Sequence, residues 1–189
     1  MNPAISNLVI ILFLVQAAKK IDFENPLVMT SARGAYILSN LIILGAYAYI
    51  NMKINAKKDL TVIKYVEPAP MGSAEEPKAV VTTIYDYDRG QLKQLIRSTL
   101  MGVGMMCVMH FYFKYTNPLV IQSIIPLKGL FEGNLVKIHL LNKPASGELK
   151  RPWKANSGIM GAMQQGEIKT DKKSVEKAEK STRGGAKEE

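Results

Sequence analysis

The stretch LMGVGMMCVMHFYFKYTNP, Leu100–Pro118, has no charged side chain before Lys114 and ends at an Asn-Pro break. It contains four methionines, an aromatic triplet and a histidine. An apolar run of this length forms either the core helix of a soluble protein or a helix that crosses a membrane. The charges on its two sides, and the rest of the chain, favour the membrane.

Charge-free windows of 16 to 19 residues occur three times, each followed or bracketed by cations. As helices they rise about 24–29 Å, close to the roughly 27 Å hydrocarbon core of the endoplasmic reticulum (ER) membrane. Lys and Arg at their ends can extend to the headgroups. The first window lacks a basic segment ahead of it, which favours a retained helix over a signal peptide. The windows predict spans at about residues 3–18, 34–52 and 96–113.

A fourth apolar segment, Pro118–Leu141, contains Pro126, Lys128 and Glu132. Lys128 and Glu132 stand one helical turn apart and can form an ion pair. Charged groups are costly in the middle of a lipid-facing helix. Residues 118–141 therefore form a broken fourth span, a re-entrant element or an interfacial amphipathic helix.

Outside these segments, Leu60–Val66 and Ala79–Tyr85 are rich in β-branched residues and are separated by turn-forming residues. They predict a β-hairpin insert at about residues 60–85. Asp86 or Asp88 is expected to cap the helix that follows.

The end of the chain has a different composition, because apolar residues become rare and charged residues dominate. Such a composition predicts disorder, with a transient helix at Ser174–Lys180. The net charge of +9 suits ribosomal RNA phosphates or anionic headgroups, although a solvated charged face remains an alternative. The candidate contact residues in this tail are Lys150, Arg151, Trp153, Lys154, Lys172 and Lys173.

The predicted fold class is therefore mainly α. It is a multi-pass α-helical membrane protein with three to four membrane elements, a small cytosolic β-hairpin and a disordered basic C-terminal tail. The membrane domain covers residues 1–141 and the tail covers residues 142–189. If the fourth segment crosses, the excess of basic residues on one side places both termini in the cytosol.

Motifs for catalysis are absent from the sequence: it has no P-loop, no dinucleotide-binding glycine pattern, no HExxH and no nucleophile elbow. A single cysteine, Cys107, allows no intrachain disulfide and no cysteine-based metal site. We expect His110 to be a hydrogen-bonded packing residue. The sequence thus predicts a protein that is not an enzyme and uses no metal or cofactor.

Several strings resemble a known family over nearly the whole chain. They are MHFYFKYTNPLVIQSIIPLK, KYVEP, VKIHLLNKPASGELKRPWKA, the opening MNPAISN, the DYD at Asp86–Asp88, and TDKKSVEKAEK. They resemble the fungal SRP-independent targeting (SND) family, specifically its third component, which is also named as an inorganic phosphate transport protein of the ER. The resemblance implies a multi-pass ER membrane protein that serves targeting and insertion of membrane proteins beside the Sec61 translocon and other SND components. It implies no catalytic residues.

An insertase must let polar flanks of a client cross hydrocarbon, where unsatisfied polar groups cost several kcal/mol. A polar intramembrane groove would lower that barrier. The candidate lining residues are Arg97, Asn40, Gln94, Asn117, Gln122 and Lys128, of which Arg97 is favoured because a cation attracts acidic flanks. Two other functions remain open: phosphate transport or its regulation, and a non-catalytic scaffold between ribosome and translocon.

Overall fold

The computed structural model describes residues 3–67, 78–153, 170 and 174–175. The chain is mainly helical, with a small two-stranded antiparallel sheet. It divides into two compact units, which differ from the predicted division at residue 141. A helical unit contains residues 1–56 and 89–143, and a hairpin unit contains residues 57–88 and 144–189.

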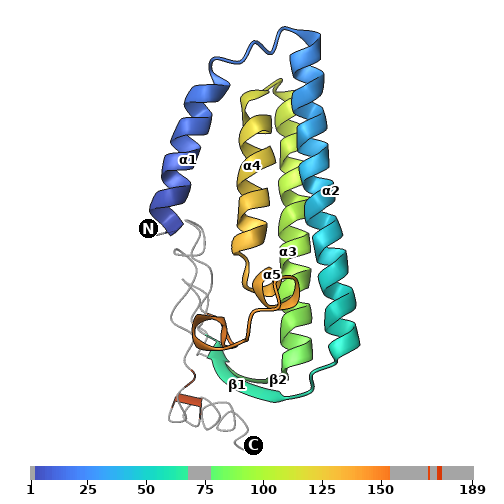
Figure 1. Ribbon diagram of the computed structural model, residues 1–189, viewed down its shortest axis with the longest axis vertical. Coiled ribbons are helices and arrows are strands. Elements are labelled where there is room, and N and C mark those ends of the chain that lie inside the picture. Colours follow the sequence, from blue (N-terminus) through green and yellow to red (C-terminus); the bar gives the residue numbers. More distant parts are fainter. Residues whose placement is uncertain (1–2, 68–77, 154–169, 171–173, 176–189) are drawn as a thin grey trace, which may run out of the picture. The chain divides into compact units, whose positions relative to one another are not determined.

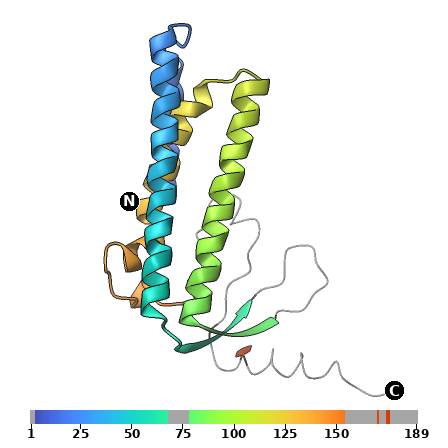
Figure 2. The ribbon, with the colours of Figure 1, turned by 90° about the vertical axis from the view of Figure 1, so that its right-hand side faces the viewer.

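Long helices make up the helical unit (Figure 1). They are α1 (Pro3–Ala18), α2 (Pro26–Lys57), α3 (Ile84–Cys107, in this unit from Arg89), its π-helical continuation η1 (Val108–Tyr112), α4 (Asn117–Glu132) and the short α5 (Asn134–His139). Helix α1 packs against α4. Figure 2 shows α2 and α3 running alongside each other.

Helix α2 buries one stripe of residues at spacings of three and four, namely Ser39, Ile43, Tyr47, Ile50 and Ile54. Its other faces are also apolar, and Leu38 and Leu41 are 59% and 62% exposed. A helix that is apolar on every side is typical of a membrane span. Among the residues that the structure describes, the helices Pro26–Lys57 and Ile84–Tyr112 are long and apolar enough to cross a membrane, and Leu8–Ala18 is a shorter apolar helix. The structure confirms a helix at each predicted window, and the crossing itself stays a prediction.

The fourth apolar segment is a helix that breaks at Gly133. Helix α4 contains Pro126 and ends where Gly133 takes an extended conformation, with φ −64° and ψ 137°. The predicted ion pair between Lys128 and Glu132 is confirmed. Serines satisfy backbone carbonyls close to the proline: the Ser39 hydroxyl of α2 donates to the Ser123 carbonyl at 2.7 Å, and the Ser123 hydroxyl donates to the Leu119 carbonyl at 2.7 Å.

Ser39 is 4% exposed, so removing its hydroxyl tests the contact between α2 and α4. Ser39→Ala is expected to lower the free energy of unfolding by about 0.6 kcal/mol, the mean for hydrogen bonds between membrane helices. Ser31→Ala is the matched control, because the exposed Ser31 hydroxyl donates to Leu27 within its own helix. Unfolding by SDS, followed by circular dichroism, measures both. Equal losses in the two variants would contradict the assignment.

The predicted hairpin is confirmed in the second unit. Strand β1 (Val62–Glu67) pairs with β2 (Lys78–Thr83), with Val62 opposite Thr83 and Glu67 opposite Lys78. Thr83, the last residue of β2, directly precedes the first residue of α3. Its hydroxyl donates to the Asp86 carboxylate at 2.7 Å, and the Asp86 amide donates back to that hydroxyl at 3.1 Å. An amide that donates to the side-chain oxygen three residues before it is the bond of an N-cap, so the expectation that Asp86 or Asp88 caps α3 was wrong: Thr83 is the cap and Asp86 is its partner.

Disorder was predicted from residue 142 onward, and this is wrong for residues 144–153. They contain a 3₁₀ helix, Gly147–Leu149, and Trp153 is only 7% exposed. The physical reason is that Trp153 and its neighbours find partners in the hairpin unit that composition cannot reveal. Ser174 and Val175 are helical. The remainder of the predicted helix to Lys180 lies outside the described residues, as do Lys154, Lys172 and Lys173.

Candidate functional site

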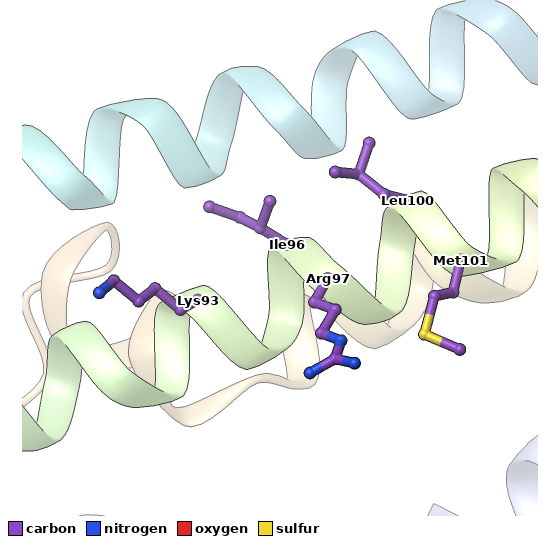
Figure 3. A pocket seen from close by; sticks show the side chains of 5 residues that line it. All are labelled: Lys93, Ile96, Arg97, Leu100 and Met101. Carbon is purple, nitrogen blue, oxygen red and sulfur yellow. The ribbon is translucent and has the colours of Figure 1, made fainter.

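A pocket of about 440 Å³ lies along α3 and is lined by Lys93, Ile96, Arg97, Leu100 and Met101. These positions follow a helical repeat of three and four, which gathers them on adjoining faces of two consecutive turns. Figure 3 shows Ile96 and Leu100 directed toward the neighbouring helix α2, and Arg97 and Met101 directed away from α2. Two cations and three apolar side chains therefore share one open pocket.

The exposed side of this pocket continues along the helix as what we call the α3 stripe. Its members recur at spacings of three and four on α3 and η1: Lys93, Arg97, Met101, Met105, Val108 and Tyr112. Met101 and Met105 are 66% and 64% exposed, whereas Met106 on the other side of the helix is 1% exposed. The stripe thus has cations at one end and exposed, flexible thioethers in its middle, and methionines of this kind are over-represented at binding surfaces that accept varied partners.

Of the predicted groove residues, Arg97 lines this pocket, and Gln94 is exposed elsewhere on α3. Asn40, on α2, donates to the Tyr36 carbonyl of its own helix at 2.9 Å. The others lie on α4, where Asn117 is exposed, Gln122 is half-buried and Lys128 pairs with Glu132. The structure therefore spreads the set over three helices.

Lys93 was missed by the sequence analysis, although it lies one helical turn before Arg97. The available signal was the spacing, since residues four apart on a helix are neighbours.

A second polar contact, between Arg33 of α2 and His110 of η1, lies in the same helical unit. The Arg33 Nε donates to the His110 Nε2 at 3.0 Å, and the His110 Nδ1 lies 3.3 Å from the Tyr115 carbonyl. An Nε2 that accepts requires the neutral tautomer with its proton on Nδ1, which then donates to Tyr115. His110 is 7% exposed, so its expected role as a hydrogen-bonded packing residue is confirmed.

The hairpin unit holds a buried ion pair that joins the start of α3 to the tail. The Arg151 Nε and Nη2 each donate to a different oxygen of the Asp88 carboxylate, both at 2.6 Å. The two side chains are 2% exposed for Asp88 and 6% for Arg151. Two hydrogen bonds from one guanidinium to the two oxygens of one carboxylate make a bidentate contact, which is the strong form of an Arg–carboxylate pair.

Aromatic rings surround this ion pair. The Trp153 amide donates to the Tyr87 hydroxyl at 3.0 Å, and the Trp153 Nε1 donates to the Leu149 carbonyl at 2.9 Å. The Tyr87 ring packs edge-on against Trp153 at 5.4 Å and against Tyr65 at 5.8 Å. Burial raises the pKa of Tyr87, which precedes the predicted span 96–113, to about 12. We call Tyr65, Tyr87, Asp88, Arg151 and Trp153 the tail cluster.

The tail cluster bears on the predicted contact residues. Arg151 and Trp153 are held inside it, whereas Lys150 is exposed. The pairing of Asp88 with Arg151 could not be found from the sequence, because the two residues are far apart in it. Among the residues that the structure describes, no three His, Cys, Asp or Glu side chains gather as a metal site.

A family model described as "Phosphate transport (Pho88)" matches residues 1–186 of this chain. The chain belongs to the Pho88 family. SRP-independent targeting protein 3 of Saccharomyces cerevisiae is 47% identical over 189 residues, covering 100% of both chains. The SRP-independent targeting protein 3 homolog of Schizosaccharomyces pombe is 40% identical over 179 residues, covering 94% of this chain and 91% of its own.

A further Pho88 relative, an uncharacterized protein of Schizosaccharomyces pombe, is 48% identical over 162 residues, covering 85% of this chain and 80% of its own. No solved structure matches this Pho88 chain. The family resemblance expected from the sequence is thus confirmed.

Proposed function

We propose that this protein is an ER membrane component of SRP-independent targeting, and that it receives and inserts client membrane segments along the α3 stripe. Of the relatives that cover at least nine tenths of the chain, one is named SRP-independent targeting protein 3 and another is named its homolog. The observation that carries the mechanism is the pocket on α3, where Lys93 and Arg97 adjoin exposed Leu100 and Met101.

The mechanism follows from the cost of moving polar groups into lipid. A client helix carries apolar residues that lipid accepts and polar flanks that it rejects. Cations of Lys93 and Arg97 would attract an acidic flank at the start of the stripe. The thioethers of Met101 and Met105 would then contact the apolar part of the client without requiring one particular sequence. This lowers the barrier without a nucleotide.

The surroundings of the protein form the second part of the proposal. We place it as a multi-pass protein beside the Sec61 translocon and other SND components, with both termini in the cytosol. We assign contact with ribosomal RNA or headgroups to the exposed Lys150 and to Lys154, Lys172 and Lys173. Arg151 and Trp153 serve the tail cluster instead, because leaving it would break a buried ion pair.

Site-specific photocrosslinking tests the client path. A photoreactive amino acid at Met101 or Met105 is expected to crosslink a nascent client in ER microsomes. The same probe at Leu41, exposed on α2, is the matched control and should crosslink lipid only. Equal client yields from the two helices would show that the α3 stripe is not the client path.

The same cations favour one other function, the phosphate transport of the family description. Lys93 and Arg97 are two cations on one helical face, and a carrier needs cations that converge on its anion. Purified protein in vesicles should show no uptake of radiolabelled phosphate if it is an insertase. Uptake that disappears in Arg97→Glu would replace our proposal with this one.

A further inference from the structure

The register of the hairpin sorts its side chains onto two faces. Cross-strand partners share a face, and successive residues alternate between faces. One face, which we call the Val66 face, carries Val62, Lys64 and Val66 with Thr83, Val81 and Ala79. The other, the Tyr65 face, carries Ile63, Tyr65 and Glu67 with Thr82, Val80 and Lys78.

The first part of the tail is bound on the Tyr65 side. Tyr65 packs against Tyr87, which packs against Trp153, and Tyr87 accepts the Trp153 amide proton. The Asp88–Arg151 ion pair adjoins these rings, since the Arg151 guanidinium lies 5.4 Å from the Trp153 ring centroid. Residues 151–153 are therefore attached through partners of this face.

A later part of the tail is bound on the opposite face. Val66 and Val175 form one buried cluster, at 6% and 8% exposed, and Ala79 packs against it. Val66 and Ala79 are cross-strand partners, so Val175 packs on the Val66 face, opposite the face that carries Tyr65. The tail thus contacts the Val66 face directly through Val175, and it reaches Tyr65 on the other face through Tyr87.

We propose that the tail of this chain is an intramolecular ligand of the hairpin, which it binds directly through Val175 on the Val66 face and indirectly through Trp153, whose partner Tyr87 packs on Tyr65. A lone two-stranded hairpin is marginally stable in water, and both of its faces carry β-branched or aromatic side chains that need cover. Val175 covers part of the Val66 face, and Tyr87, which Trp153 contacts, packs on Tyr65 of the other face. The Val66 face is then the docking surface of residues 174–175 of the same chain, and any other partner there must displace Val175. This inference is independent of the client path along α3.

Paired cysteines in the full-length, membrane-embedded protein test the contact. In a Cys107→Ser background, which removes the one native cysteine, Val66→Cys with Val175→Cys is expected to give an intrachain disulfide on mild oxidation. Val80→Cys with Val175→Cys is the matched control, because Val80 is adjacent to Ala79 in sequence but lies on the Tyr65 face. It should remain reduced.

Each result of this experiment is decisive. A monomeric crosslinked species, found only with Val66→Cys, supports binding of the chain's own tail. A disulfide-linked dimer would assign the Val66 face to a second copy and overturn the proposal. Equal oxidation of both pairs, or of neither, would show that Val175 does not dock there.

Hydrogen exchange provides a second measurement that does not depend on cysteine chemistry. Val175→Asp should accelerate amide exchange in β1 and β2 at least tenfold, whereas Val175→Ile should leave it unchanged. Val81→Thr is a control on the same face, since Val81 is 56% exposed. Exchange in Val175→Asp that equals the unsubstituted protein would overturn the proposal even if the cysteine variants fold poorly.

Discussion

Replacing Lys93 and Arg97 together with glutamate is expected to reduce insertion of clients with acidic flanks at least tenfold. The change turns attraction into repulsion at the start of the α3 stripe. Charges about 4 Å apart interact by about 4 kcal/mol at an effective dielectric constant of 20, and 1.4 kcal/mol already corresponds to a factor of ten. The measurement is protease protection of a single-span client inserted into liposomes that contain the purified protein.

The control for this double variant is Lys53→Glu, because Lys53 is an exposed cation on α2 and does not line the pocket. It should insert the client normally. Clients with basic flanks should regain insertion in Lys93→Glu/Arg97→Glu, since the signs are then complementary again. Undiminished insertion of acidic-flanked clients would remove both cations from the client path.

Removing the Asp88 carboxylate is expected to give the largest loss of stability. Asp88→Ala leaves the Arg151 guanidinium, 6% exposed, without its buried partner. Breaking a buried ion pair from one side costs about 3–5 kcal/mol. The single tryptophan, Trp153, lies in the tail cluster and reports on it directly. Denaturant titration followed by Trp153 fluorescence in detergent should therefore show a lowered midpoint.

Two further variants distinguish the effect of breaking the ion pair from the effect of removing a carboxylate in general. Glu148→Ala removes an exposed acid close to Arg151 in sequence and should shift the midpoint little. Asp88→Leu with Arg151→Met should restore most of the stability, because apolar replacement of a buried pair is often neutral or better. If Asp88→Ala unfolds at the same denaturant concentration as Glu148→Ala, the pair does not stabilise the hairpin unit.

The tail cluster also affects the interpretation of variants in which the C-terminal tail is truncated. Deletion of all residues after Lys143 removes Arg151, Trp153 and Val175, and so removes packing partners of the hairpin together with basic residues. A loss of function in that variant would not distinguish ribosome contact from a damaged hairpin unit. Charge-neutralising substitutions at Lys150, Lys154, Lys172 and Lys173 leave the cluster intact and isolate the contribution of charge.

Local signals in the sequence predicted the long helices and the hairpin. Charge-free windows predicted the positions of α1, α2 and α3, and β-branched runs predicted the hairpin within two residues at each strand end. The Lys128–Glu132 pair was also predictable, because its partners lie one turn apart on one helix. The cap of α3 was assigned to the wrong residue, since Thr83 and Asp86 both have side chains that suit a helix start.

The candidate site was only partly predictable. Arg97 was identified from its place beside an apolar window, and its position next to Lys93 could have been predicted from their spacing. The pocket that both share with Leu100 and Met101 is seen only in the structure. His110 was predicted to be a hydrogen-bonded packing residue, but its partner Arg33 could not be predicted, because their hydrogen bond joins residues from different helices. The Asp88–Arg151 pair could not be predicted for the same reason, because its two residues are far apart in the sequence.

The sequence by itself determined which segments are helical, which are extended and where cations flank apolar runs, because these properties depend on neighbours within a few residues. Only the tertiary structure decided that the start of the tail is ordered and which charges are buried. Composition assigned residues 144–153 to disorder, but Arg151 and Trp153 find their partners in residues more than 60 positions away. The free energy that orders them comes from burial and hydrogen bonds across that separation, and no local pattern encodes it.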